Sequence, residues 1–460
     1  MNPDVAPDRD QARLKTQRTG WYGYGWASHT FEATVVAVFA GRYLSAVADN
    51  AAGTDDGTGR LHVLGLPIAS GSLYSYTIGL GSLLLFVLLP IVGAIADRTG
   101  RKREMLLGFG YTSAVLCALM IFIGETSWVL GALLLLGAYL TYSAAKIVYN
   151  SILPDIAGPD ERDKVSSVGW AIGYMGGGVL LAINFVWSFF IDDKALLARL
   201  SLSSAGVWWM LFAIIAVVKL RHLPKPAESL TPVTGSVFTA GFRELRKTLR
   251  EARGYPLTLM FLIAYLIYFD GISTVTSMAA VYADKELHLE ETFLLTTILV
   301  VQFVAFGGAL LLGRLAERWG AKRTIMGGLI IWIAVVVIAY FVQEHAQWQF
   351  FSLAIVLALV LGGTQALSRS AFSGMIPKGK EAEYFSLYEV SSSGTSFLGP
   401  VLFGLTLQFT DSYRYAILAM ILFFVVGLAV LSRINVRKAI VDAGNTPPAS
   451  LKESSHKVTV

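Results

Sequence analysis

Long apolar runs recur along the whole chain and constrain its fold more than any other feature. A membrane-spanning helix needs about 20 mostly apolar residues, and only helices and closed barrels satisfy the backbone inside a bilayer. The chain has only 15% charged residues, against about 25% in a soluble domain. We predict an all-α integral membrane protein with twelve spans, at residues 24–46, 70–95, 105–124, 128–149, 165–190, 204–221, 256–282, 292–315, 323–342, 348–371, 384–408 and 413–433.

Lysine and arginine lie mostly on one side of these spans. Of the 37 such residues, all but six fall in the N-terminal segment, the regions after even-numbered spans, or the C-terminal tail; the six are Arg42, Arg60, Lys194, Arg199, Lys285 and Arg414. Cytoplasmic loops carry an excess of Lys and Arg. We therefore expect both termini to be cytoplasmic in a multi-pass protein of the cell membrane. The basic balance indicates topology, not nucleic-acid binding. The first 20 residues are polar, which predicts no cleaved signal peptide.

The second half of the sequence repeats features of the first. GAIADRTGRKR (Gly93–Arg103) follows the second span, and GRLAERWGAKR (Gly313–Arg323) follows the eighth. Two six-span halves in parallel repeat are a recurring transporter architecture, with the binding site near midplane between them. We predict an N-terminal segment at 1–23, a six-helix bundle at 24–221, a linker with a basic amphipathic helix at 222–255, a second bundle at 256–434, and a disordered tail at 435–460.

The repeated loop motif has a predicted chemistry of its own. Asp97 can meet Arg101 and the N-terminus of a nearby helix, which favours anions. Such a charge cluster can hold one conformation and release it in another, whereas one copy alone could simply set topology. Because the motif occurs twice, we expect a conformational gate formed by Gly93, Asp97, Arg98, Gly100 and Arg101 in the first copy and by Gly313, Glu317, Arg318 and Gly320 in the second.

Acidic residues in the first and seventh spans are the main candidates for a transport site. Charged side chains at membrane depth are costly and face a cavity or the bundle interior. Glu32 lies about 12 Å into the first span, one turn from His29. Asp270 lies midway along the seventh span, the repeat partner of the first. We expect Glu32 and Asp270 to carry protons or bind a cationic group, with His29 modulating Glu32. The alternatives are a polar pair that sets helix packing and, at Asp270, a helix bend beside Gly271.

Other polar and aromatic side chains are predicted to bind the solute: Gln365, Arg369, Asn184, Trp26 and Tyr268. Arg369 has two interpretations, an extension to lipid headgroups or a fork that holds a carboxylate or phosphate. Asn184 binds the solute or makes an interhelical hydrogen bond. Lys146 is expected to extend to the membrane interface, and Trp208 and Trp209 to lie in the interfacial aromatic belt.

Motifs for cofactors or catalysis are missing from the sequence. Cys117 is the only cysteine, so the chain has no intramolecular disulfide and no cysteine-based metal cluster. No metal-ligand spacing, nucleotide loop or nucleophile elbow occurs. We predict that the protein is not an enzyme and uses no cofactor and no metal.

The loop motif after the second span, with a weaker copy after the eighth, resembles the major facilitator superfamily. Within it, several stretches resemble the vacuole-effluxer-like (autophagy-related) family: WYGYGWASHTFEATVVAVF, VYNSILPDIAGPDER, GWAIGYMGGGVLL, YFDGISTV, GGTQALSRSAFSGMIP and TSFLGPVLFG. Fungal members of that family are associated with release of amino acids from the vacuole, so the resemblance implies amino acid efflux. The family's first span usually carries an Asp and an Asn where this chain has Gly25 and Ser28, and His29 and Glu32 are departures from it.

We therefore predict a secondary active transporter that rocks two halves around a central site. It is expected to act as a monomer in the bilayer and to move a small polar solute, an amino acid in the first place, together with protons. One alternative is an exporter of drugs or of other polar metabolites, such as sugars or organic ions, on the same fold. The other is a non-transporting receptor or scaffold, which would need neither carboxylates in both repeats nor two gate motifs.

Overall fold

Helices form nearly all of the structure, a computed structural model that describes residues 5–53, 59–63, 66–221, 223, 246, 248, 250–394 and 398–451. The only strands within these ranges are an antiparallel hairpin, β1 (Arg60–Val63) and β2 (Leu66–Ala69). The helices of the first half are α1 (Val5–Thr30), the π-helix η1 (Phe31–Phe39), α2 (Ala40–Ala52), η2 (Ser70–Ser72), α3 (Leu73–Thr99), α4 (Lys102–Ala118), η3 (Leu119–Phe122), α5 (Trp128–Ser151), α6 (Leu153–Ile156), α7 (Arg162–Trp187) and α8 (Lys194–Lys219).

The second half continues the pattern. Its helices are α10 (Pro256–Lys285), α11 (Glu291–Trp319), α12 (Ala321–Tyr340), α13 (Gln347–Gly374), α14 (Glu381–Gly394), α15 (Leu398–Thr410), α16 (Tyr413–Leu418), α17 (Ile421–Ser432), α18 (Val436–Asp442) and η4 (Ala449–Leu451). Among the described residues, eleven helical segments are long and apolar enough to cross a membrane. They overlap every predicted span except the eleventh. That span consists of α14 and α15, on either side of residues 395–397, which lie outside the described ranges.

The first helix begins at Val5, so it extends the predicted first span toward the N-terminus; its only proline, Pro7, lies in the first turn, where proline is tolerated. One prediction at the other end of the chain needs correction. The disordered tail predicted from residue 435 is wrong for residues 436–451. Asn435 caps α18 by accepting a hydrogen bond from Lys438 N at 3.0 Å. Most of the predicted linker helix lies outside the described residues.

The chain divides into two compact units. Unit 1 comprises Met1–Leu89, Arg101–Tyr149 and Met175–Leu223. Aromatic side chains form its core: Trp21 stacks on Tyr149 with ring centroids 4.4 Å apart and donates its Nε1–H to the Tyr149 carbonyl. Trp209 is 1% exposed and lies edge-on to Tyr142. The prediction that Trp209 belongs to an interfacial belt is therefore wrong.

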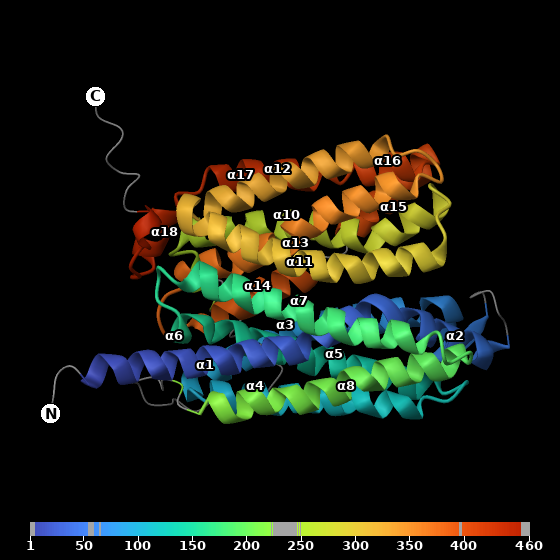
Figure 1. Cartoon of the computed structure of the whole chain (residues 1–460), viewed down its shortest axis with the longest axis horizontal. Helices are drawn as coiled ribbons and strands as arrows, with labels where there is room; N and C mark the ends of the chain where they lie inside the picture. The colour runs from blue at the N-terminus through green and yellow to red at the C-terminus, as the bar shows by residue number, and fades with distance from the viewer. Residues whose placement is uncertain are drawn as a thin grey trace. The chain divides into compact units, whose positions relative to one another are not determined.

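Unit 2 comprises Pro90–Gly100, Asn150–Tyr174 and Pro224–Val460. The end of α3, all of α6 and the first part of α7 thus pack with the helices of the second half. Helix α13 runs beside α11 and α12, and α17 lies against α10 and α12 (Figure 1). Trp332 stacks on Phe424, and Tyr265 on Tyr388, inside this unit. Helix α18, red in Figure 1, lies at one end of these helices.

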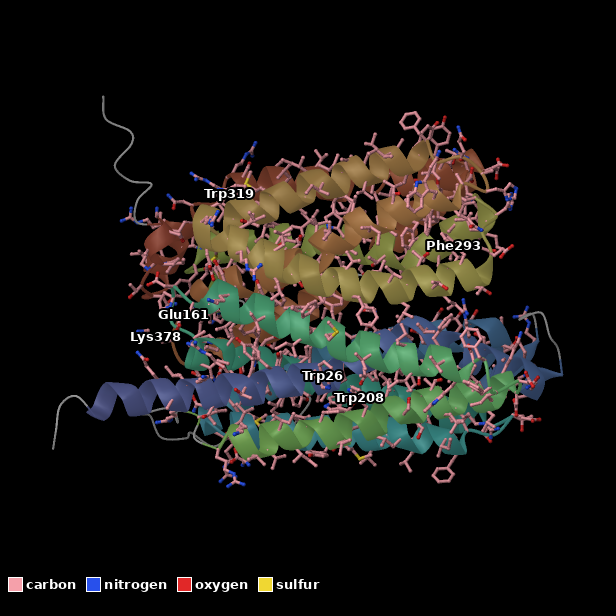
Figure 2. The ribbon with its side chains drawn as sticks, in the orientation of Figure 1. Trp26, Glu161, Trp208, Phe293, Trp319 and Lys378 are labelled. Carbon is pink, nitrogen blue, oxygen red and sulfur yellow. The ribbon has the colours of Figure 1, made fainter. Side chains whose placement is uncertain are left out.

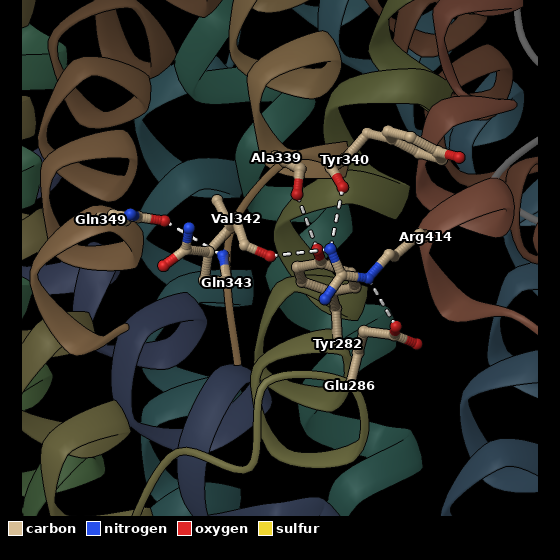
Figure 3. Close-up of polar contacts among 8 residues, drawn as sticks. All are labelled: Tyr282, Glu286, Ala339, Tyr340, Val342, Gln343, Gln349 and Arg414. Atoms are coloured by element: carbon tan, nitrogen blue, oxygen red, sulfur yellow. Dashed lines mark hydrogen bonds and ion pairs between the residues drawn. The ribbon is translucent and has the colours of Figure 1, made fainter. Parts of the chain in front are cut away.

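Arg414 fastens the opposite ends of the second-half helices within unit 2 (Figure 3). Its Nε donates to Glu286 Oε1 at 2.7 Å, and Nη1 donates to the carbonyl oxygens of Tyr340 and Val342. The Tyr282 hydroxyl donates to the Ala339 carbonyl at 2.6 Å. One guanidinium therefore ties α16, the end of α10 and the turn after α12 together.

Candidate functional site

An ion pair lies inside the membrane-spanning helices of unit 1. Lys146 Nζ of α5 is 3.0 Å from Glu32 Oε1 of η1. His29 Nε2 is 3.9 Å from Glu32 Oε2, so the expected pairing of these two residues is present. The Lys146 ammonium also lies over the Tyr142 ring, 5.8 Å from its centroid. The prediction that Lys146 extends to the membrane interface is wrong, because its ammonium points to a carboxylate.

The surroundings of this pair suit a functional site. The side chains of Glu32 and Lys146 are 33% and 23% exposed, and exposed charges within a span require a polar cavity because lipid contact is costly. Glu32 is the second residue of the nine-residue π-helix η1. Such π-helical turns are rare in proteins, but those that do occur are often at functional sites. The acidic member of the pair thus lies on a helix segment whose backbone departs from regular α geometry.

Two other predicted solute ligands in unit 1 contact protein groups. Trp26 of α1 stacks on Trp208 of α8 with ring centroids 5.9 Å apart (Figure 2). Asn184 of α7 is fully buried, and its Oδ1 accepts a hydrogen bond from Ser204 Oγ at 3.2 Å. The interhelical alternative for Asn184 therefore describes this conformation.

Asp270 lies buried in the middle of α10 in unit 2. It is 1% exposed, and its Oδ2 accepts a hydrogen bond from Gly399 N at the start of α15, at 2.8 Å. The other oxygen, Oδ1, has no hydrogen-bond partner among the described residues, and neither has the buried hydroxyl of Thr274, one turn further along. An ionised carboxylate buried without a cation is costly. This geometry suits a group that takes up a proton or a cation.

Three further candidates lie on α13 or contact it. The Tyr268 hydroxyl is 2.6 Å from Ser368 Oγ, which joins α10 to α13. Gln365 is partly exposed. Arg369 is only 4% exposed, so its predicted extension to lipid headgroups is wrong.

The Arg369 guanidinium binds protein groups in this conformation. Nε donates to Ser166 Oγ at 3.0 Å, Nη2 to the Ser166 carbonyl at 2.9 Å, and Nη1 to Asn150 Oδ1 at 3.2 Å. It also lies 5.6 Å from the Trp170 ring. The next residue, Ser370, donates from its Oγ to Asp163 Oδ1 at 2.5 Å. The start of α7 is therefore bonded to the end of α13. Neither Asn150 nor Ser166 was among the predicted site residues.

The first copy of the loop motif caps a helix, as predicted for Asp97. Its two carboxylate oxygens accept hydrogen bonds from Ala382 N at 3.0 Å and Glu383 N at 2.8 Å, at the start of α14. A Cβ on Gly93 would lie 2.6 Å from the Ala382 carbonyl oxygen, so only glycine allows this approach. Gly100 has φ 59°, where glycine is favoured. We call the end of the helices that carries both motif copies the basic end.

The second copy makes the reciprocal contact with the start of α7. A Cβ on Gly313 would lie 2.6 Å from Ser167 Cβ. Glu317 is 4.0 Å from Lys164, but these side chains are 40% and 67% exposed, so the pair is weak. Gly320 has φ 80° and ends α11. Each copy thus packs against a helix start from the other half of the sequence, within unit 2.

Comparison with known proteins gives matches along nearly the whole chain. The family model described as "Vacuole effluxer Atg22 like" matches residues 13–444. The uncharacterised MFS-type transporter YxiO of Bacillus subtilis is 29% identical over 91% of this chain and 95% of its own. Autophagy-related protein 22 of Eremothecium gossypii is 28% identical over 95% of this chain and 94% of its own.

Solved structures agree on the fold. The fucose:proton symporter FucP of E. coli aligns with TM-score 0.64 and 14% identity over 91% of this chain and 97% of its own. The proton:xylose symporter XylE aligns with TM-score 0.63 and 11% identity, over 91% and 94%. These likenesses confirm the predicted fold of twelve helices in two six-helix halves.

Proposed function

This chain belongs to the Atg22-like vacuole effluxer family, and we propose that it exports a small zwitterionic solute, an amino acid in the first place, in exchange for protons. It is an MFS-type membrane transporter, and its relatives are transporters, not enzymes. The identity of the solute, its direction of movement and the coupling to protons are our proposal. Both termini would lie on the cytoplasmic side of the cell membrane, and the transporter would act as a monomer.

The Glu32–Lys146 pair is the observation that carries this proposal. Its two opposite charges lie 3.0 Å apart inside the spans and remain partly accessible. An amino acid brings an ammonium and a carboxylate of similar separation. It can insert so that its ammonium pairs with Glu32 and its carboxylate with Lys146. Each charge then exchanges one partner for another, and no charge is left unpaired.

Solutes of other charge types fit the pair less well. Two unit charges about 4 Å apart attract by about 4 kcal/mol at an effective dielectric constant of 20. A monocation that took Glu32 would bring no anion to replace it beside the Lys146 ammonium, and a monoanion that took Lys146 would bring no cation to replace it beside Glu32. A sugar has no charge with which to separate the pair. Electrostatics therefore favour a zwitterion.

Asp270 is our candidate for the proton site. Its buried carboxylate has one oxygen on Gly399 N and one without a partner among the described residues. Taking up a proton would remove the cost of an unpaired buried charge. His29, within 3.9 Å of Glu32, would modulate the solute pair rather than carry the transported proton.

Competition among solutes of defined charge tests this proposal in proteoliposomes. A radiolabelled neutral amino acid serves as the probe, and its methyl ester, its N-acetyl derivative and a hexose serve as competitors. We expect the free amino acid to compete at least about tenfold better than the others, since each lacks one charge-assisted contact or both. Equal competition by the ester would indicate a monocation, and competition by the hexose a sugar; either result would refute zwitterion recognition.

A charge reversal separates recognition from general damage. Glu32→Lys and Lys146→Glu each place like charges together, whereas the double variant restores an opposite pair in reverse order. We expect each single variant to lose transport and the double variant to recover part of it. Glu344→Lys, on an exposed residue of an outer loop, is the matched control. Full transport by both single variants would contradict the assigned role of the pair.

A further inference from the structure

Residues Arg433–Leu451, which follow the last span, pack back onto the basic end of unit 2. We call this segment the strap. Lys322 Nζ, at the start of α12, donates to the carbonyl oxygens of Ser432 and Ile434, both at 2.8 Å. Residues at helical spacing then turn inward, and Val436, Ala439, Ile440 and Ala443 are buried. The strap is therefore a fixed part of the unit.

The middle of the strap closes the end of α13. Asn445 Nδ2 donates to the carbonyl oxygens of Gly374 at 3.0 Å and Ile376 at 2.6 Å. The last carbonyl groups of a helix need such partners. Ile440 Cδ1 and Arg162 Nη1 both lie 3.6 Å from the position of a Cβ on Gly374. The strap and the start of α7 thus meet the end of α13 at the same place.

The end of the strap reaches the first half of the sequence. Ala449 N donates to Asp160 Oδ1 at 2.6 Å, in the turn before α7. A pocket beside the strap is lined by residues from both halves of the sequence, among them Arg162, Asp163, Lys322, Ser370 and Thr446. The strap is bonded to α12 and α13 on one side and to the turn before α7 on the other.

We propose that the strap is a latch that stabilises the conformation closed at the basic end. Opening that end must separate the start of α7 from α13, which breaks the Arg369–Ser166 and Ser370–Asp163 contacts. Because the strap is anchored on the second-half helices, the same movement must also break the bond between Ala449 and Asp160. Loss of the strap's contacts therefore shifts the protein toward the open state. This inference does not depend on the solute or on proton coupling.

The test measures how often the basic end opens, by the labelling rate of a buried cysteine. Ala382→Cys, made with Cys117→Ala, places the only thiol where the Asp97 carboxylate meets α14; Ala382 is 0% exposed. Ala449→Pro removes the amide that donates to Asp160 at the first residue of η4, where proline is tolerated. Ala449→Ser keeps that amide and is the matched control. Asn445→Ala removes the two bonds to the end of α13.

We expect maleimide to label the reporter about three- to tenfold faster in Ala449→Pro and in Asn445→Ala, the effect of losing one or two hydrogen bonds. Ala449→Ser should label at the rate of the reporter alone. The labelling rate is measured on folded, monodisperse protein without any solute, so its outcome does not depend on the transport assays. An unchanged labelling rate in both Ala449→Pro and Asn445→Ala would overturn the proposal, as would equal acceleration in Ala449→Ser.

Discussion

Replacing Lys146 by methionine isolates the energetic role of the intramembrane pair. The substitution keeps a long apolar stem but removes the ammonium 3.0 Å from Glu32. Removing one partner of a fully buried ion pair costs about 3–5 kcal/mol, because the other charge is left unpaired. Here the side chains are 33% and 23% exposed, and water screens them in part. We therefore expect Lys146→Met to lower the free energy of unfolding by about 1–3 kcal/mol.

A double-mutant cycle gives the coupling between the two residues. Glu32→Gln removes the carboxylate that has lost its lysine, so the double variant should be more stable than Lys146→Met alone, with a coupling energy of about 1–3 kcal/mol. The assay is thermal or denaturant unfolding of the purified protein in detergent, with all four variants in one buffer. Equal stability of Lys146→Met and wild type, with a coupling energy near zero, would refute the claim that the Glu32–Lys146 pair stabilises the folded protein.

Three further predictions concern contacts within unit 2. Gly93→Ala should reduce transport about tenfold or more, because its Cβ would lie 2.6 Å from a backbone oxygen of α14, where nothing flexible can move aside. The control Gly108→Ala, whose Cβ meets nothing within 4 Å, should transport normally. Equal transport rates in the two variants would contradict this prediction. Arg369→Lys should lower stability by about 1–3 kcal/mol in unfolding assays, since lysine cannot form the fork on Ser166 and Asn150; wild-type stability would contradict the buried network. Arg414→Met should lower the unfolding temperature by several degrees through loss of three hydrogen bonds, and an unchanged temperature would show that the clamp is dispensable.

The spans could be predicted because a bilayer demands about 20 apolar residues, and composition alone shows where these occur. The role of Asp97 could also be predicted, since an acid in a tight loop has few favourable partners other than a helix N-terminus. The contact of Lys146 with Glu32 could not. A lysine near the end of a span has the same sequence signature whether it extends to headgroups or turns inward. Only the packing of α5 against η1 decides between them.

The helix after the last span has a sequence pattern that our prediction did not use. Val436, Ala439, Ile440 and Ala443 have the spacing of an amphipathic helix, and Asn435 is a favoured N-cap residue. The polar residues around them suggested disorder. The network of Arg369 with Asn150 and Ser166 joins residues about 200 positions apart, and no local pattern reveals such a contact.

Proton movement in proteoliposomes tests the central claim most directly. Purified wild type and Asp270→Asn are reconstituted with a pH-sensitive dye inside, and a panel of amino acids is added, with Glu344→Gln as a control for loss of an exposed carboxylate. The account predicts that an amino acid drives proton movement in wild type and in the control, and that Asp270→Asn abolishes it. If no amino acid moves protons, or if Asp270→Asn moves them as wild type does, proton-coupled amino acid transport through Asp270 is contradicted.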